Sequence, residues 1–237
     1  MQRLTLAAAL LAVSGAAVAG DFDFNPGSTQ QDFALITKDL TGGLNFKSLH
    51  PAETNGITGI GVGVTFSYTK TAERPAWERM TGSEVNFLPV AALKAVKGLP
   101  FGFDVGAFYS TVPGASAKLY GAEVRYSIID GGVATPAVTV RAAYSTVAGV
   151  DDFDFESKSV DLAVSKGFTL FTPYAGVGQV WGEAEGKGDF AFLGNPDTKE
   201  TRTYAGLRIG LGLLDITPEY ERVGDNDSFS LLLGLSI

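Results

Sequence analysis

Nine charged residues occupy one face of segments in which polar and apolar residues alternate. They are Asp104, Glu123, Arg125, Arg141, Asp161, Arg202, Arg208, Glu219 and Glu221. Glu219 and Glu221 are spaced for one face of a strand, and two neighbouring carboxylates can divide general acid and base roles between them. The nearby arginines would keep both carboxylates ionised, which disfavours that chemistry. We expect the nine residues to form a network of buried ion pairs, with a charged constriction in a narrow pore as the alternative.

Histidine and cysteine, which carry much of the nucleophilic and metal chemistry of proteins, are almost absent. The chain has one histidine and no cysteine. His50 precedes Pro51, and the stretch 50–56 has the composition of a turn, so we interpret His50 as a turn residue. We therefore expect no enzyme activity, no metal site and no cofactor.

Two further groups of residues interrupt the alternation and are candidates for exposed sites. The acidic group comprises Asp151, Asp152, Asp154 and Glu156, followed later by Asp225 and Asp227. These carboxylates could attract Ca²⁺ or Mg²⁺, but neither stretch matches an EF-hand loop, so we expect solvated hairpin tips. The aromatic group comprises Phe190, Phe192 and Leu193, with Trp77 in an earlier loop. It either folds over its surroundings or contacts a lipid or a partner.

The first 19 residues have the features of a secretory signal peptide. Arg3 supplies a positive start, the apolar run 4–13 is too short for a membrane helix, and Ala17-Val18-Ala19 is a cleavage site. No run of about 18 apolar residues follows. The formal net charge of −8 argues against a nucleic-acid partner. We expect an exported protein.

The elements that must position the charged residues are short segments with a period of two. Between Lys118 and Ile129 every second residue is apolar, while Glu123 and Arg125 lie on the opposite face, which indicates a strand. Ten segments follow the pattern: 57–69, 85–96, 101–111, 118–129, 135–147, 157–166, 170–181, 201–211, 216–223 and 229–237. A soluble sandwich could alternate in the same way, but recurrence behind an export signal favours a closed antiparallel transmembrane barrel with a polar lumen. If 45–49 is also a strand, twelve strands are the alternative.

A short helix is predicted before the first strand. Ser28 and Gln31 have the spacing of a capping box, and Gly42-Gly43 suits a helix end. The chain therefore divides into a signal peptide at 1–19, a helical plug or periplasmic segment at 20–56 and a barrel at 57–237.

The signal peptide, the even set of alternating strands and the outward-apolar last strand together resemble small Gram-negative outer-membrane β-barrel proteins. The resemblance covers roughly 57–237, and the helix is loosely similar to the plug segments of fatty-acid-transport-type barrels. The last strand, 229–237, resembles the assembly signal of such barrels but ends in Ile237 rather than an aromatic residue. The resemblance implies a cell outer-membrane location, contact with outer-membrane lipid and lipopolysaccharide, and recognition by the barrel-insertion machinery.

Connection lengths predict the orientation of such a barrel. Long connections at 71–84, 113, 151–156, 183–199 and 225–228 would face the exterior, and the short turns and both chain ends the periplasm.

Two functions remain open at this point. Inward glycines favour a non-enzymatic barrel that gives limited passage or binding to small or hydrophobic solutes. Balanced lumenal charges favour a structural or surface-interaction barrel with a sealed lumen.

Overall fold

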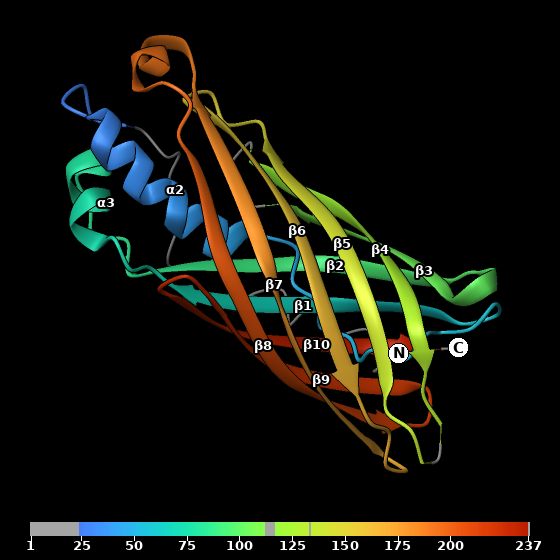
Figure 1. Ribbon diagram of the computed structural model, residues 1–237. Coiled ribbons are helices and arrows are strands. Elements are labelled where there is room, and N and C mark those ends of the chain that lie inside the picture. The colour runs from blue at the N-terminus through green and yellow to red at the C-terminus, as the bar shows by residue number, and fades with distance from the viewer. Residues whose placement is uncertain (1–23, 112–116, 133, 237) are drawn as a thin grey trace, which may run out of the picture.

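The chain forms a closed barrel of ten antiparallel strands, as seen in a computed structural model that describes residues 24–111, 117–132 and 134–236 (Figure 1). The predicted signal peptide and the turn near 113 lie outside the described residues. The strands are β1 (Ile60–Lys70), β2 (Phe87–Gly98), β3 (Phe103–Thr111), β4 (Lys118–Asp130), β5 (Ala137–Ala148), β6 (Phe153–Ser165), β7 (Phe171–Gly186), β8 (Asp197–Leu211), β9 (Leu214–Val223) and β10 (Asn226–Ser236). Each pairs with its neighbours along the chain, and β1 closes the barrel against β10. The prediction of ten strands is confirmed, and the twelve-stranded alternative is not formed.

The alternation of the sequence places apolar side chains outside and polar ones inside. On β6, Val160 and Leu162 are 46% and 47% exposed, whereas Ser159 and Asp161, which alternate with them, are buried. Serine, threonine and charged side chains line the interior of most other strands in the same way, whereas β2 also turns Leu88, Ala92 and Val96 inward. This is the reverse of a soluble protein and is the arrangement of a barrel with lipid around it.

Three strands extend beyond the others at one end of the barrel. β6, β7 and β8 have 13, 16 and 15 residues, compared with 10 in β9. The predicted loops at 151–156 and 183–199 are correspondingly too long. Most of the acidic stretch belongs to β6, where Phe153 and Phe155 point inward and are buried. The interpretation of Asp154 and Glu156 as hairpin-tip residues was wrong, because both lie on the outward face of a strand.

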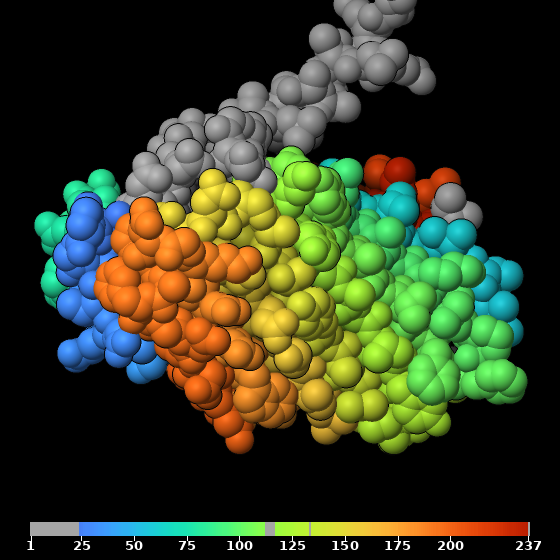
Figure 2. All heavy atoms as spheres, turned by 90° about the horizontal axis from the view of Figure 1, so that it is seen from above, coloured from blue at the N-terminus to red at the C-terminus, as the bar shows by residue number. Residues whose placement is uncertain are grey.

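Helix α2 (Gln30–Leu44) lies at the same end and packs against α3 (Arg74–Thr81) and the short 3-10 helix η3 (Gly188–Leu193). Figure 2 shows α2 in blue beside α3 and the β7–β8 connection, which is orange. The N-cap is Thr29, one residue after the predicted Ser28, and its hydroxyl accepts from the backbone N–H of Asp32. Among the described residues, no helix is long and apolar enough to cross a membrane.

After α2 the chain runs through the barrel. Residues 45–49, 51 and 52 are buried and His50 is partly buried, and a turn at 56–58 then leads into β1. The segment predicted as a turn at 50–56 does contain bends at 50, 52 and 53 and the start of a turn at 56, and its residues 51 and 52 are buried in the lumen. Phe24, the first described residue, lies at the end with the long connections, where its N–H donates to the Asp152 carboxylate. β10 ends beside the start of β1, at the other end of the barrel. Both chain ends, which were predicted to lie on one side, are outside the described residues.

Candidate functional site

An apolar cluster closes the end of the barrel that carries the long connections and joins α2, α3, η3 and the long strands. We name this end the wide end and the opposite one the narrow end or narrow rim. Trp77 is fully buried in this cluster, as are Phe33 and Leu40 of α2. Phe190 meets Phe24 edge-on, with their ring centroids 5.4 Å apart, whereas Phe192 remains 51% exposed. Of the two predicted arrangements for the aromatic loop, folding over the mouth describes Trp77 and Phe190.

Two carboxylates fix α2 to this mouth. Asp39, with no exposed surface, accepts hydrogen bonds from the Trp77 indole at 2.8 Å, the Asn226 amide at 2.6 Å, and two backbone N–H groups at residues 72 and 73. Asp32 forms an ion pair with Arg79 at 2.6 Å. The hydrogen bond from the Arg79 guanidinium holds the pKa of the Asp32 carboxyl below its usual range. Helix position is thus specified by polar contacts as well as apolar packing.

Below the helix, seven charged side chains form one continuous series of alternating sign, which we name the lumenal ion-pair chain. In order they are Lys47, Glu221, Arg202, Asp161, Arg141, Glu123 and Lys94, with N···O distances of 2.5, 2.6, 3.3, 2.5, 3.4 and 3.2 Å. All seven are at most 9% exposed. Buried charges of this kind are tolerated only when each has a partner, and here each has at least one.

The lumenal ion-pair chain begins and ends on the same short segment of backbone. Lys47 belongs to that segment, and its ammonium donates to the Gly42 carbonyl at 2.6 Å and to the Ser228 hydroxyl at 3.1 Å. Lys94, at the other end of the series, donates to the carbonyl oxygen of Lys47 at 3.2 Å and to that of Ser48. The ammonium of Lys94 also lies 4.7 Å from the ring centroid of Phe46. The charged wall and the threaded segment therefore hold each other in place.

The backbone of residues 44–55 is hydrogen-bonded by side chains of the wall, because it has no neighbouring strand to pair with. Two backbone N–H groups donate to wall side chains: that of Leu49 to the Glu219 carboxylate at 2.9 Å, and that of Ala52 to a serine hydroxyl at 3.1 Å. Carbonyl oxygens accept from the wall in turn, that of Leu44 from Ser145 at 2.7 Å and that of Ala52 from a threonine. These bonds reach strands far away in sequence and seal the segment to the wall.

Arg125 contacts both the wall and the segment at the end of the lumen opposite α2. Its guanidinium pairs with Asp104 at 3.4 Å, donates to the Pro51 carbonyl, and lies 2.8 Å from the imidazole Nδ1 of His50. The backbone bends at His50, as predicted, but the ring is partly buried and contacts a wall arginine. The described residues contain no group of three His, Asp or Glu side chains placed to hold a metal ion.

The structure brings eight of the nine predicted charges into the lumen. The ninth, Arg208, pairs with Asp215 at 2.8 Å near the narrow rim, where its side chain is 29% exposed. The carboxylate of Glu219 forms no ion pair among the described residues and accepts instead from the Tyr174 hydroxyl at 2.7 Å. Sequence reasoning missed Lys47 and Lys94. It also placed arginines near both glutamates, whereas of the two only Glu221 forms an ion pair with an arginine among the described residues, namely Arg202.

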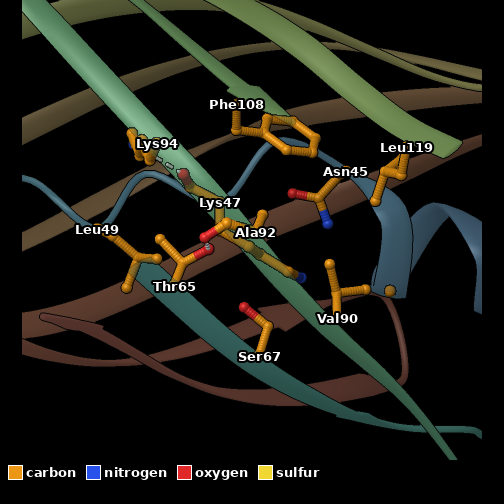
Figure 3. Close-up of a pocket in the computed structure, with 11 residues that line it drawn as sticks. Asn45, Lys47, Leu49, Thr65, Ser67, Val90, Ala92, Lys94, Phe108 and Leu119 are labelled. Atoms are coloured by element: carbon orange, nitrogen blue, oxygen red, sulfur yellow. Dashed lines mark hydrogen bonds between the residues drawn. The ribbon is translucent and has the colours of Figure 1, made fainter. Parts of the chain in front are cut away.

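The inward glycines do not leave an open channel. Tyr204 lies across Gly176 of the neighbouring strand, and Tyr174 lies across Gly206, so that a Cβ atom at either glycine would clash with a tyrosine ring. A cavity of about 20 Å³ remains between the segment and β1–β4, with Lys47 and Lys94 in its lining (Figure 3). A second, of about 30 Å³, lies towards the narrow rim. Each has room for roughly one or two water molecules.

Comparison with known proteins assigns no family to the chain. No protein-family model matches the chain, and no curated protein matches it in sequence. Among solved structures, the attachment invasion locus protein Ail of Yersinia pestis is 15% identical, with a TM-score of 0.33, and the match covers 76% of this chain and 97% of Ail. The N-terminal β-barrel domain of OprF from Pseudomonas aeruginosa is 12% identical with a TM-score of 0.35, covering 75% and 97%. The KdgM porin, solved with disordered oligogalacturonate, is 8% identical with a TM-score of 0.39, covering 75% and 99%. These neighbours are small outer-membrane β-barrels, and similarity this low assigns no ligand.

Proposed function

We propose that the chain is a non-enzymatic outer-membrane barrel whose lumen is sealed by its own N-terminal segment and which acts through the face at its wide end. The observation that carries the proposal is the burial of residues 45–49, 51 and 52 inside the barrel, where the two cavities beside them have volumes of about 20 and 30 Å³. A hydrated solute cannot pass through spaces of that size.

The outer-membrane location rests on the surface of the barrel. Closed barrels satisfy every backbone group internally, which is what a strand structure surrounded by lipid requires. Apolar side chains face outward along every strand, and tyrosine and tryptophan side chains such as Tyr68, Tyr109 and Trp181 are 40% to 48% exposed on that outward face. Aromatic residues in such positions are typical of membrane–water interfaces.

Limited passage of solutes, the other function considered, would require the segment to leave the lumen. That movement would break the contacts of Lys47 and the bonds between the wall and the backbone of 44–55. Removing one partner of a buried ion pair alone costs about 3–5 kcal/mol, so spontaneous opening is disfavoured. The geometry therefore supports the sealed barrel better than the open one.

The direction in which the threaded segment runs through the barrel determines which part of the chain lies at the exterior face. Long connections of outer-membrane barrels face the exterior, so the mouth formed by α2, α3 and η3 would be the cell-surface face. Phe24 lies at this mouth, which places the start of the described chain there too. The surface-exposed region would then combine two loops with the N-terminal segment.

Two measurements test the proposal. The refolded chain from Gly20 onward, placed in planar bilayers, is expected to show no steady ion conductance, whereas steady channels in this protein would overturn the sealed lumen. In intact cells, an epitope inserted before Phe24 is expected to be stained by antibody, and an epitope in the β8–β9 turn at Gly212 is not. Staining of Gly212 alone would reverse the orientation and refute the surface role of the mouth.

A further inference from the structure

The two cavities of about 20 and 30 Å³ lie on the same side of the threaded segment. The upper one, nearer α2, lies against β1 to β4, and the lower one, nearer the narrow rim, lies against β1, β2 and β8 to β10. Leu49 and Lys94 border both cavities, so these two side chains separate them. We name the two cavities, together with the space that Leu49 fills between them, the divided pocket.

The divided pocket exists because small inward residues line this side of the lumen. A Cβ atom at Gly61 of β1 would have its nearest neighbour at 3.8 Å, and one at Gly234 of β10 at 3.5 Å. Both glycines therefore have room for a side-chain atom. At Gly176 and Gly206, across the barrel, tyrosine rings fill the corresponding space.

Leu49 divides the pocket from a strained backbone conformation. Its φ is 49°, in the left-handed region that residues other than glycine rarely adopt. Its N–H donates to the Glu219 carboxylate at 2.9 Å, and Lys94 donates to the carbonyl oxygens of the two preceding residues, so the surrounding contacts hold the backbone in place. A change to an ordinary negative φ would redirect the leucine side chain, and the strain released would offset part of the cost of that movement.

The lining of the upper cavity determines what could occupy the pocket. Its apolar wall is formed by Val90, Phe108 and Leu119. The Lys47 and Lys94 ammonium groups are each paired with a carboxylate, at 2.5 and 3.2 Å, so no charge is left for an anion. The Oδ1 atom of Asn45, a residue that is 3% exposed, has no hydrogen-bond partner among the described residues and points towards the side of Phe108 (Figure 3). A buried acceptor of this kind requires a donor.

We propose that the divided pocket binds a small uncharged molecule with an apolar body and one hydrogen-bond donor, which enters from the narrow rim when Leu49 moves aside. The donor would meet the Oδ1 atom of Asn45, and the apolar body would meet the wall of the upper cavity. The water molecules that fit into the two cavities and the side chain of Leu49 together correspond to roughly six to eight non-hydrogen atoms. The inference rests on the proposed sealed lumen, because the threaded segment forms one side of the pocket.

The test measures binding of para-fluorophenol to the refolded chain from Gly20 by fluorine NMR. This probe has the expected size, an apolar ring and one hydroxyl donor, and para-fluorotoluene has the same shape without the donor. The parent is compared with Leu49→Gly, which removes the dividing side chain and accepts a positive φ without strain. Leu44→Ala is the matched control, because it truncates a leucine that packs against the apolar cluster and borders neither cavity. Heat-dependent electrophoretic mobility checks that each variant is folded, and Leu49→Ala is a second variant with the same expected result.

Leu49→Gly is expected to bind para-fluorophenol at least about tenfold more tightly than the parent, because the parent binds only in the minor state in which Leu49 has moved. Leu44→Ala should bind as the parent does. Para-fluorotoluene should bind to Leu49→Gly about fivefold more weakly than the phenol, since it leaves Asn45 without a donor. Adding Gly61→Val to Leu49→Gly should abolish binding, because the new side chain fills the lower cavity.

Equal binding by the parent and Leu49→Gly, or binding that Gly61→Val leaves unchanged, would overturn the proposal. Equal affinity for the phenol and the toluene would overturn the assigned class of ligand. A cysteine at Ser48 should react with a bulky thiol reagent at the same rate with and without Leu49→Gly, and faster reaction would mean that the whole segment leaves. Steady channels in the parent would refute the proposed function, whereas silent bilayers without specific probe binding refute only the pocket.

Discussion

Lys47 is the one charged side chain that the threaded segment contributes to the lumenal ion-pair chain. Replacing it with methionine keeps most of the side-chain volume but removes the partner that Glu221 meets at 2.5 Å. It also removes one of two donors to the Gly42 carbonyl, which keeps the Asn45 amide at 2.9 Å. Removing one partner of a buried ion pair costs about 3–5 kcal/mol. Arg202 still contacts Glu221 at 2.6 Å, so the lower part of that range is the better expectation.

Lys47→Met destabilises the sealed state but not an opened state, because Glu221 can be hydrated in the opened state. A loss of about 3 kcal/mol would therefore raise the opened population by roughly a hundredfold. Because the chain contains no cysteine, one introduced at Ser48, which is 2% exposed, reports opening through its reaction with a membrane-impermeant thiol reagent. Labelling through brief opening scales with the open population when closing is fast. Lys47→Met should accelerate labelling of Ser48→Cys by roughly a hundredfold and produce brief conductance events.

Two comparisons make the test specific. Lys38→Met removes an exposed lysine of α2 and should leave the labelling rate unchanged. Lys47→Met combined with Glu221→Gln should recover most of the loss, because the unpaired buried charge is then gone. Unchanged labelling in Lys47→Met, or additive effects in the double variant, would show that the ion pair does not hold the segment.

Three other predictions concern the wall and the mouth. Arg141→Ala should lower the free energy of unfolding by about 3–5 kcal/mol, since its carboxylate partners remain buried, and an unchanged midpoint in urea would mean that the lumen is hydrated. Gly176→Ala should lower the same quantity by about 1–3 kcal/mol because the new methyl group meets the Tyr204 ring, and a wild-type midpoint would show that the ring can move aside. Asp32→Asn should lower the melting temperature at pH 7 but not at a pH below the folded-state pKa of Asp32. That pKa is below the unfolded value of 3.8, so the ion pair with Arg79 stabilises above 3.8 and is lost as the pH falls through the folded pKa. An equal loss at both pH values would contradict that reasoning.

The ten strands could be predicted because the alternation of a lipid-facing strand is local. Each β-strand has the same two faces along its length, and the sequence alone contains that period. The pattern fails where the inner face is not polar. Inward residues of β2 include Leu88, Ala92 and Val96, so Lys94 does not stand out as a lumenal residue in a segment that is apolar on both sides.

The expected pattern, with polar residues on the inner face, also fails for the acidic stretch at the mouth. Its sequence alternates between acidic residues and Phe153 or Phe155, which is a strand period, but with the apolar residues facing inward against α2. The rule of polar residues inside holds only where the strands enclose a polar segment. Where they enclose the apolar side of a helix, the two faces exchange character, and the acidic residues face outward.

A plug was one of the two alternatives predicted for 20–56, but the path of the threaded segment could not be predicted because nothing in its own sequence is periodic. Its backbone is satisfied by side chains of distant strands, as in the bond from Ser145 to the Leu44 carbonyl, and only the closed barrel creates those partners. Such bonds to backbone atoms do not depend on which side chains the segment carries. They can hold an extended chain in the lumen, but they do not by themselves choose its register.

The balance of buried charges determines the register of the threaded segment. Apart from the rim pair of Arg208 and Asp215, the strands bury four cations and five carboxylates in the lumen, so the wall alone is one positive charge short when all are ionised. Lys47 provides it, and only at the register in which its ammonium reaches Glu221 and the helix end at Gly42 together. A shift by one residue would turn the lysine away from this carboxylate and place Phe46 or Ser48 there instead. The wall thus recognises the segment through many hydrogen bonds to the backbone and one charge, and the charge sets the register.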